Sequence, residues 1–468
     1  MPRPRRPRLR LLGTIIAVLS VCLIASAPAS ARPGGRFSVG APGVGDPYLP
    51  LAGNGGYDVR HYDITLRYDP PSPRLDAVTR IRAVASQDLS RLDLDYRGPP
   101  ISSLTVDGEP ARFSRHGQEL AVRPARGIQE GASFLVTVAY AGTPHAIKGP
   151  FGAPFGWHAT DDGTFVADEP NAAPTWYPCD DHPTDKASYR FRVTVPAGKT
   201  AVANGRLAAK RTRHGERTFV WVESAPMSTY LSTVTIGKFA VQRGRTDGGV
   251  PVYVAVDSDV AEESTSVYDT TRAVVDYFAT LFGPYPFRTT GAIVDDANLG
   301  YAMETQTRPA YSGPPSSGMI AHELGHQWFG DAVTPATWRD AWLNEGFATY
   351  ASWLWTAHTG GPSPAEIFHK LYAQGKDAAF WGPPPGDPGQ LDLFGPSVYA
   401  RGAMTLQALR ERVGGHAFFR ILRSWVREHR YGTATTDDFI ALAERVSGKN
   451  LDHLFDVWLY HHGKPRSW

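Results

Sequence analysis

Residues 321–330 read Ala321-His322-Glu323-Leu324-Gly325-His326-Gln327-Trp328-Phe329-Gly330, which contains the pattern His-Glu-x-x-His. Residues four apart lie on the same face of a helix, so His322 and His326 can direct two imidazoles at one point. Zinc binds neutral imidazole nitrogen readily. Glu323, next to the first histidine, suits a general base that acts on a metal-activated water. The stretch therefore predicts a zinc-binding helix in a catalytic domain.

A third ligand for the same metal follows further along the chain. Glu345 stands nineteen positions after His326, in the run Trp342-Leu343-Asn344-Glu345-Gly346-Phe347-Ala348. A second helix that begins near Trp342 can bring Glu345 back beside the histidines. Two His and one Glu leave a fourth zinc position open, as a catalytic site requires. We predict one zinc per chain. The alternative is a buried, satisfied histidine pair, which the acidic residue in an apolar helical run disfavours.

Composition narrows the classes of partner. Hydrophobic residues make up 42% of the 468 residues and charged residues 20%, as is ordinary for a globular protein. The formal net charge is +2, and five Arg lie in residues 1–31, so the remainder is close to neutral. Nothing in this balance favours nucleic acid or an anionic membrane. Of the two cysteines, Cys22 lies in the apolar leader, so a mature chain keeps only Cys179 and forms no internal disulfide.

The first 31 residues have the pattern of an export signal. A basic segment precedes an apolar segment, Leu11 to Ala25, that is too short to span a bilayer comfortably. Ala29-Ser30-Ala31 offers a small-x-small cleavage site before Arg32. We therefore predict a signal peptide over residues 1–31, cleavage near Ala31-Arg32, and a secreted mature protein without a membrane span. An uncleaved anchor is the alternative interpretation.

The chain is long enough for two or three domains. Residues 32–56 are rich in Gly and Pro and are interpreted as a linker or loosely held arm. From Tyr57 onward apolar and polar residues alternate with the period of half-buried strands. The first alternating apolar set is Tyr62, Ile64, Leu66 and Tyr68. We predict an all-β sandwich or saddle over residues 57–245.

Helical spacing takes over after about residue 250. Ser316 and Ser317 can cap the zinc helix, which is predicted to end at Gly330. Further helices are predicted over residues 261–281, 342–358, 368–379, 399–413 and 417–429. We assign residues 246–468 to a mostly helical zinc domain, so the predicted fold class is α+β.

These motifs resemble the metal signature of the zinc aminopeptidase family of the aminopeptidase N and leukotriene-hydrolase type, among the gluzincins. Residues 322–330 and 342–348 match that signature with the same eighteen-residue interval. Three further runs also match the family: Val333-Thr334-Pro335, Phe282-Gly283-Pro284-Tyr285-Pro286-Phe287 and Trp176-Tyr177-Pro178-Cys179-Asp180. The resemblance extends from about Tyr57 to Pro465. It implies an N-terminal β domain followed by a thermolysin-like zinc peptidase domain.

The resemblance also implies residues that bind the amino terminus of a substrate. Family members carry a Gly-x-Met-Glu-Asn loop whose Glu holds the free α-amine, and the matching run here is Tyr301-Ala302-Met303-Glu304-Thr305. Tyr301 and Thr305 depart from the family pattern, which affects the local backbone and the shape of the first side-chain pocket. A second acid, Glu169, precedes Pro170. The implied substrate-binding residues are Glu304, Glu169, Ala302 and Met303.

A carboxylate pair explains physically how an exopeptidase selects its bond. A cationic amine between two carboxylates gains charge-assisted hydrogen bonds, and this fixes the scissile bond one residue from the terminus. The alternative is that Glu304 and Glu169 are solvated loop acids.

Tyr399 completes the residues that the resemblance implies. In Tyr399-Ala400-Arg401-Gly402 it matches the tyrosine of the family's Tyr-x-Lys-Gly, whose hydroxyl stabilises the oxyanion, and Arg401 stands where Lys is usual. The alternative is a core tyrosine at the start of a helix. Many family members continue with a helical superstructure that caps the site, whereas this chain ends at Trp468. We therefore expect a short form with a more open cleft.

The sequence thus predicts a secreted zinc metallo-aminopeptidase that hydrolyses the N-terminal bond of peptides with a free N-terminus, with Glu323 as general base and Tyr399 at the oxyanion. Two alternatives stay open. A zinc endopeptidase of the same fold would cleave amino-blocked peptides as well as free ones. A catalytically retired, secreted binding module is disfavoured because Glu323 is retained. The pattern of residues predicts neither the preferred N-terminal side chain nor the oligomeric state.

Overall fold

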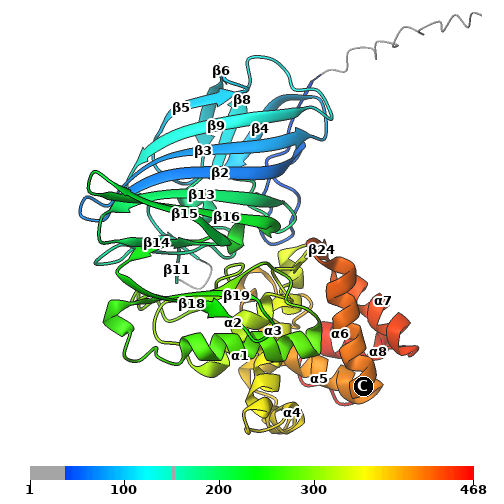
Figure 1. Cartoon of the computed structure of the whole chain (residues 1–468). Coiled ribbons are helices and arrows are strands. Elements are labelled where there is room, and N and C mark those ends of the chain that lie inside the picture. The colour runs from blue at the N-terminus through cyan, green and yellow to red at the C-terminus, as the bar shows by residue number, and fades with distance from the viewer. Residues whose placement is uncertain (1–36, 150–152) are drawn as a thin grey trace, which may run out of the picture. The chain divides into compact units, whose positions relative to one another are not determined.

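An eight-stranded sheet dominates the first half of the computed structural model, which describes residues 37–149 and 153–468 (Figure 1). Across the sheet the strands are β15 (Arg206–Arg213), β16 (Glu216–Ser228), β13 (Lys186–Pro196), β2 (Tyr57–Asp69), β3 (Arg74–Ala85), β9 (Ser133–Gly142), β5 (Ile101–Val106) and β6 (Glu109–Pro110). Buried and partly exposed residues alternate along β2, β3, β9 and β13. This confirms that the alternating pattern marks half-buried strands of an N-terminal β domain.

Two smaller sheets complete the β domain. One contains β1 (Ser38–Val39), β4 (Leu89–Asp95), β8 (Glu119–Arg123) and β7 (Arg112–His116). The other contains β10 (Ile147–Lys148), β11 (Pro154–Ala159), β12 (Thr164–Ala167), β17 (Val234–Gly237) and β14 (Thr200–Ala203). Their buried side chains join those of the large sheet in one apolar core. The domain is therefore held by burial, and its free Cys179 is itself buried.

A mixed sheet of five strands leads into the helical half. Its order is β18 (Phe239–Arg245), β19 (Pro251–Asp257), β20 (Thr290–Val294), β22 (Ala310–Tyr311) and β21 (Ala302–Met303). The three central strands run parallel, and the two edge strands are antiparallel to their neighbours. The predicted division between residues 245 and 246 falls in the turn between β18 and β19. One strand of this sheet thus comes from the segment assigned to the β domain.

Eight α-helices form most of the second half (Figure 1). They are α1 (Val267–Phe282), α2 (Ser317–His326), α3 (Trp342–His358), α4 (Pro364–Tyr372), α5 (Gly402–Val413), α6 (Gly415–His429), α7 (Thr436–Ser447) and α8 (Asp452–Phe455). A two-stranded pairing of β23 (Val333–Pro335) with β24 (Gly432–Ala434) lies among them. Among the described residues, no helix has the length and apolar character needed to cross a membrane. The β domain followed by these helices confirms the predicted α+β class.

Two close approaches between backbones set the positions of the site helices. A Cβ added at Gly325 of α2 would lie 2.9 Å from the Cβ of Ala351 on α3. A Cβ added at Gly346 of α3 would lie 2.9 Å from the Cα of Gly402, where α5 begins. Only glycine leaves room for these contacts. They bring α2, α3 and the segment before α5 into one tightly packed group.

The helix boundaries differ from the sequence prediction in several places, and the first is α1, which begins at Val267 instead of residue 261. α2 begins after Ser316, whose hydroxyl accepts a hydrogen bond from Met319 N at 3.2 Å as predicted, but the helix ends at His326 instead of Gly330. There the N–H of Asp331 donates to the carbonyl of His326 over 2.9 Å, which turns the chain sharply. α4 occupies residues 364–372, earlier than predicted, because Ser363 and a glutamate three residues later form a capping box. α7 and the short α8 were not predicted.

Residues 37–56 are more firmly attached than a loosely held arm. The buried carboxylate of Asp46 accepts hydrogen bonds from the backbone N–H groups of Tyr48 and Trp338, both at 2.8 Å. Its second oxygen also lies 3.3 Å from His182 Nε2. The segment therefore links the β domain to the loop that precedes α3.

Candidate active site

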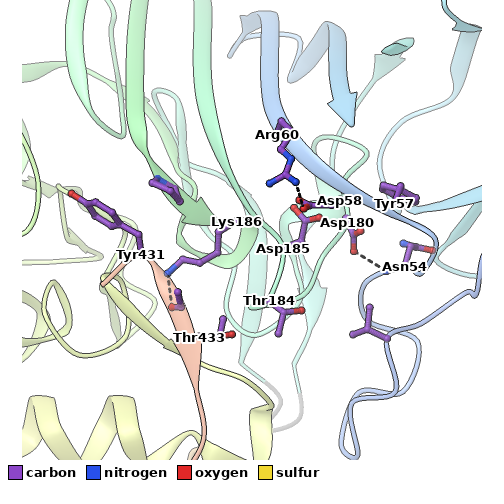
Figure 2. Close-up of a pocket in the computed structure, with 13 residues that line it drawn as sticks. Asn54, Tyr57, Asp58, Arg60, Asp180, Thr184, Asp185, Lys186, Tyr431 and Thr433 are labelled. Atoms are coloured by element: carbon purple, nitrogen blue, oxygen red, sulfur yellow. Dashed lines mark hydrogen bonds and ion pairs between the residues drawn. The ribbon is translucent and has the colours of Figure 1, made fainter. Parts of the chain in front are cut away.

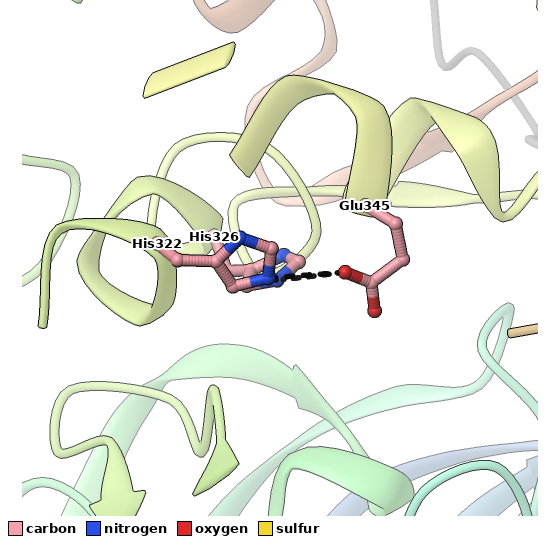
Figure 3. Close-up of side chains that lie close together, drawn as sticks. All are labelled: His322, His326 and Glu345. Carbon is pink, nitrogen blue, oxygen red and sulfur yellow. Dashed lines mark hydrogen bonds and ion pairs between the residues drawn. The ribbon is translucent and has the colours of Figure 1, made fainter. Parts of the chain in front are cut away.

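Two helices bring the three predicted metal ligands together (Figure 3). α2 presents His322 and His326, and the first turn of α3 presents Glu345. His322 Nε2 lies 3.1 Å from Glu345 Oε2 and 3.2 Å from His326 Nε2, and the remaining distance, from His326 Nε2 to Glu345 Oε2, is 3.5 Å. Tetrahedral zinc with ligands at about 2.0–2.1 Å places them about 3.3 Å apart. The donor set and its spacing therefore fit one zinc ion.

Secondary contacts and charge also favour a cation at this point. His326 Nδ1 lies 3.2 Å from the carbonyl oxygen of Phe329, so a proton on Nδ1 leaves Nε2 free to bind metal. Burial by itself lowers the pKa of His326, but the carboxylates of Glu304 and Glu345 outweigh it and raise the pKa to about 10. His326 thus lies in strongly negative surroundings, which a divalent ion would neutralise.

Glu323 faces the same space as the metal ligands. One of its carboxylate oxygens lies within 4.8 Å of donor atoms on both His326 and Glu304. Its side chain is buried, and this burial raises the pKa of the carboxyl well above its usual range, while His326 acts in the opposite direction. A poorly solvated carboxylate is a stronger proton acceptor than one in water. The position and environment suit a general base.

Glu169 and Glu304 form a buried carboxylate pair beside the metal ligands. One oxygen from each, together with one from Glu345, lies within 4.8 Å of the others. Glu169 is 7% exposed and Glu304 is 2% exposed, and Glu304 Oε1 has no hydrogen-bond partner among the described residues. Burial is the main cause of the raised pKa of both groups, and Glu304 adds to the effect on Glu169. These are therefore not solvated loop acids.

Ala302 and Met303 form β21, the strand that precedes Glu304. Within the described residues β21 pairs with β22 alone and lies at the edge of the mixed sheet, where a strand has backbone groups left for a further extended chain. Gln327 Nε2 donates to the carbonyl of Glu304 over 3.1 Å and so fixes this loop to the end of α2. Both departures from the family pattern are accommodated: Tyr301 donates to the carbonyl of Pro154, and the hydroxyl of Thr305 donates to the carbonyl of Arg308.

Tyr399 lies in a π-helical turn, Ser397–Arg401, just before α5. Its ring stacks on the ring of His322 with centroids 6.0 Å apart and an interplanar angle of 18°. Burial raises the pKa of Tyr399, and the nearby carboxylate of Glu345 raises it further, so the hydroxyl keeps its proton. The buried guanidinium of Arg401 donates to the carbonyls of Val457 and Trp458, which anchors the turn. Arg401 thus has a structural role in holding Tyr399 beside the metal ligands.

Several buried polar residues around the site were not predicted from the sequence. Asp331 is fully buried, both carboxylate oxygens lack a partner among the described residues, and burial followed by the charge of Glu304 raises its pKa. Asn344 Nδ2 donates to the hydroxyl of Tyr230 over 3.4 Å, and that hydroxyl donates to the carbonyl of Gly330 over 3.3 Å. A charged residue directly after the metal motif was the one local signal for Asp331. Tyr230 comes from the β domain, and no local pattern marks it.

Lys186 links the two halves of the molecule behind Asp331. It lies on β13, and its Nζ donates to the carbonyl of Asp331 at 2.9 Å, the hydroxyl of Thr334 at 2.6 Å and the carbonyl of Gly432 at 3.3 Å. Burial lowers the pKa of Lys186 to about 7. Lys186 also lines a cavity of about 390 Å³ together with Asp180 and Asp185, and these side chains are drawn in Figure 2. The contact fixes the loop after α2 against the β domain.

Comparison with known proteins decides the family. Residues 59–231 match the model of the peptidase M1 N-terminal domain, and residues 301–458 match that of the peptidase family M1 domain. The crystal structure of an M1 zinc metallopeptidase from Deinococcus radiodurans superposes with a TM-score of 0.85 at 30% sequence identity, over 91% of this chain and 98% of that one. The chain belongs to the M1 family of zinc metallopeptidases. Membership confirms the predicted family, and the ligand set His322, His326 and Glu345 agrees with its zinc dependence.

Other M1 proteins match with different coverage. Aminopeptidase M1 of Arabidopsis thaliana is 28% identical over 64% of this chain and 36% of its own length. Tricorn protease-interacting factor F2 of Thermoplasma acidophilum is 25% identical over 87% of this chain and 54% of its own. The chain thus spans about a third to a half of the curated relatives that it matches. A variant of the Deinococcus peptidase, bound to a Tyr-Ser-Ala substrate, superposes with a TM-score of 0.84 at 29% identity, over 91% of this chain and 99% of that one.

Proposed function

We propose that this M1 protein is a zinc aminopeptidase that removes single residues from the free amino terminus of peptides. The observation that carries the proposal is the buried pair of Glu169 and Glu304 beside the metal ligands. An ammonium group between two buried carboxylates gains charge-assisted hydrogen bonds and relieves their repulsion. The Tyr-Ser-Ala tripeptide bound by the Deinococcus relative is a ligand of this chemical class.

Different residues of the chain have different roles in the proposed reaction. His322, His326 and Glu345 would hold the zinc ion, and the bound ion would supply Lewis acidity to a water molecule and to the peptide carbonyl. Glu323 accepts the proton of the attacking water on a carboxylate oxygen and returns it to the nitrogen of the leaving amine. The hydroxyl of Tyr399 donates a hydrogen bond to the oxygen on which negative charge develops.

The carboxylate pair and β21 orient the substrate. The amine placed between Glu169 and Glu304 sets the distance from the chain terminus to the reacting carbonyl. The edge strand β21, Ala302–Met303, offers backbone groups to an extended substrate. Together they favour cleavage after the first residue.

Replacing Tyr399 with Phe tests the oxyanion role. We expect kcat to fall by about 10²–10³-fold, because one donor to the developing charge is lost, while KM changes little. Zinc content should stay stoichiometric because Tyr399 is not a predicted ligand. Steady-state kinetics and elemental analysis of the purified variant check both points. If the variant kept the kcat of the parent protein, Tyr399 would have no role in stabilising the oxyanion.

A digestion experiment separates the aminopeptidase from the endopeptidase alternative. The purified protein is incubated with a peptide of about ten residues, and the products are followed by mass spectrometry over time. We expect successive loss of one residue from the amino terminus. Early internal fragments, or equal degradation of an N-acetylated copy, would favour the endopeptidase.

We also propose that the protein is exported and that residues 1–31 are removed. The basic segment, the apolar segment and Ala29-Ser30-Ala31 support this proposal, and all of them lie outside the described residues. N-terminal sequencing of protein recovered from the medium of expressing bacteria should then begin near Arg32. Secreted material that still begins at Met1 would contradict cleavage.

A further inference from the structure

A group of carboxylates outside the active site gathers where two parallel strands of the mixed sheet end. β19 ends at Asp257, and β20 is followed directly by Asp295. Their last paired residues, Val256 and Val294, lie opposite each other, so these two aspartates leave the sheet side by side. Asp259 and Asp296 follow in the adjoining turns. The loop between β11 and β12 adds Asp162, which interacts electrostatically with Asp257, Asp295 and Asp296.

Three of these carboxylates have the spacing of ligands to one calcium ion. One oxygen from each of Asp257, Asp259 and Asp296 lies within 4.8 Å of the other two. Calcium binds oxygen at 2.3–2.6 Å, so two of its ligands are at most about 5 Å apart. The donor set contains oxygen alone, which suits Ca²⁺ and does not suit zinc, whose sites use mainly nitrogen and sulfur.

Two buried side chains in the group lack the partners that burial requires. Asp257 is 1% exposed, and its Oδ2 has no hydrogen-bond partner among the described residues. Asp295 is also fully buried, and its carboxylate gains only a weak contact from the backbone N–H of Ala297. Unpartnered carboxylates in such a position are costly unless a cation joins them.

The surrounding protein provides little positive charge for the group. Lys199 Nζ lies 2.9 Å from Asp162 Oδ2 and so neutralises that carboxylate. Across the part of the chain that the structure describes, no ion pair is found for Asp257, Asp259, Asp295 or Asp296. A Cβ on Gly237 would lie 3.1 Å from Asp257 Oδ2 and 3.2 Å from Asp162 Oδ1, so both oxygens border one small space.

We propose that Asp257, Asp259 and Asp296 bind one calcium ion, with Asp295 contributing charge from behind. Water and backbone carbonyls would complete the six to eight oxygen ligands that Ca²⁺ takes. The residues of this site are separate from the zinc ligands, and the assignment of calcium does not rest on the proposed peptidase activity. It adds a second metal to the protein.

The position of the site gives it a structural consequence. Residues 295–301 connect β20 to β21, which is the strand that precedes Glu304. The far end of this connection is held by Tyr301, whose hydroxyl donates to the carbonyl of Pro154 over 2.6 Å. Calcium at Asp296 would hold the near end against the turn after β19. The ion would thereby stabilise the loop that carries the amine-binding glutamate.

Calorimetry on the zinc-loaded protein tests the proposal directly. The protein is freed of calcium over a chelating resin, its zinc content is verified by elemental analysis, and CaCl₂ is titrated in. We expect one Ca²⁺ per chain with a Kd on the order of 10⁻⁴ M or tighter. Calcium well above this Kd should also raise the melting temperature by a few degrees, because it binds only the folded state. The proposal would be overturned if calcium at a concentration 10-fold above about 1 mM produced no heat of binding and no shift in melting temperature.

Variants locate the site and separate it from the acidic active site. Asp259→Asn, which changes an exposed side chain, and Asp296→Asn should each weaken calcium binding by at least about 10-fold, because each removes one charged ligand. Glu304→Gln and the exposed Asp269→Asn should bind calcium as the parent does. Without calcium, Asp296→Asn should melt at or above the temperature of the parent, since a repulsive charge is gone. Equal calcium affinity in the parent and in both ligand variants would contradict the assignment.

Discussion

Replacing Glu323 with Gln should lower kcat/KM by about 10²–10⁴-fold, which is the usual effect of losing a general base. The amide has the shape of the carboxylate but cannot accept the proton of the attacking water. Glu323 lies within 4.8 Å of His326 and Glu304 donor atoms without belonging to the predicted ligand set, so zinc content and melting temperature should change little. Kinetics on a free-amine peptide, with zinc measured on the same preparation, give the result.

The exposed Glu262→Gln is the matched control, because it makes the same chemical change on the surface. It should keep the kinetics of the parent. Parental turnover by Glu323→Gln would show that another group accepts the proton. A loss of activity that simply follows a loss of zinc would assign Glu323 to the metal site instead.

Replacing His326 with Ala should abolish stoichiometric zinc binding and, with it, peptide hydrolysis. His326 Nε2 lies 3.2 Å from His322 Nε2 and 3.5 Å from Glu345 Oε2, so its removal leaves two of three ligands. Changes in the outer shell of metal sites already cost about 10–100-fold in affinity, and loss of a direct ligand should cost more. Elemental analysis after dialysis measures the effect.

A histidine outside the site provides the control for this change. His369 is exposed on α4, and His369→Ala should retain one zinc per chain. Adding zinc back to His326→Ala should restore little activity at concentrations that reload the chelator-treated parent. Full metal content in His326→Ala would mean that the ligand set is wrong.

The metal centre was predictable because its ligands follow a local rule. His322 and His326 are four residues apart on one helix, and the predicted second helix, 342–358, agrees with α3 at both ends. Glu304 and Glu169 were implied only by resemblance, since they come from loops far apart in sequence. Their meeting beside Glu345 depends on how the β domain packs on the catalytic half, which no local pattern encodes.

The residues that were missed depend on long-range contacts. Lys186 reaches Asp331 across 145 positions, and Tyr230 reaches Gly330 across 100. The oversight of α7 is different, because Thr435 and Asp438 form a capping box that is visible in the sequence. The zinc helix ends earlier than predicted because of a competing local contact, the hydrogen bond from Asp331 N to the carbonyl of His326.

The amine-binding role of Glu304 is the central claim, and one kinetic comparison tests it most directly. The parent protein and Glu304→Ala are each assayed on a matched pair of peptides that differ only in acetylation of the amino terminus. A buried charged pair broken at one partner costs roughly 3–5 kcal/mol, or about 10²-fold to about 4 × 10³-fold, and an open cleft would lower this figure. We predict that Glu304→Ala loses about 10²-fold on the free peptide and only a few-fold on any residual cleavage of the acetylated one, with zinc unchanged. An equal loss on both peptides would contradict the account, because Glu304 would then not bind the amine.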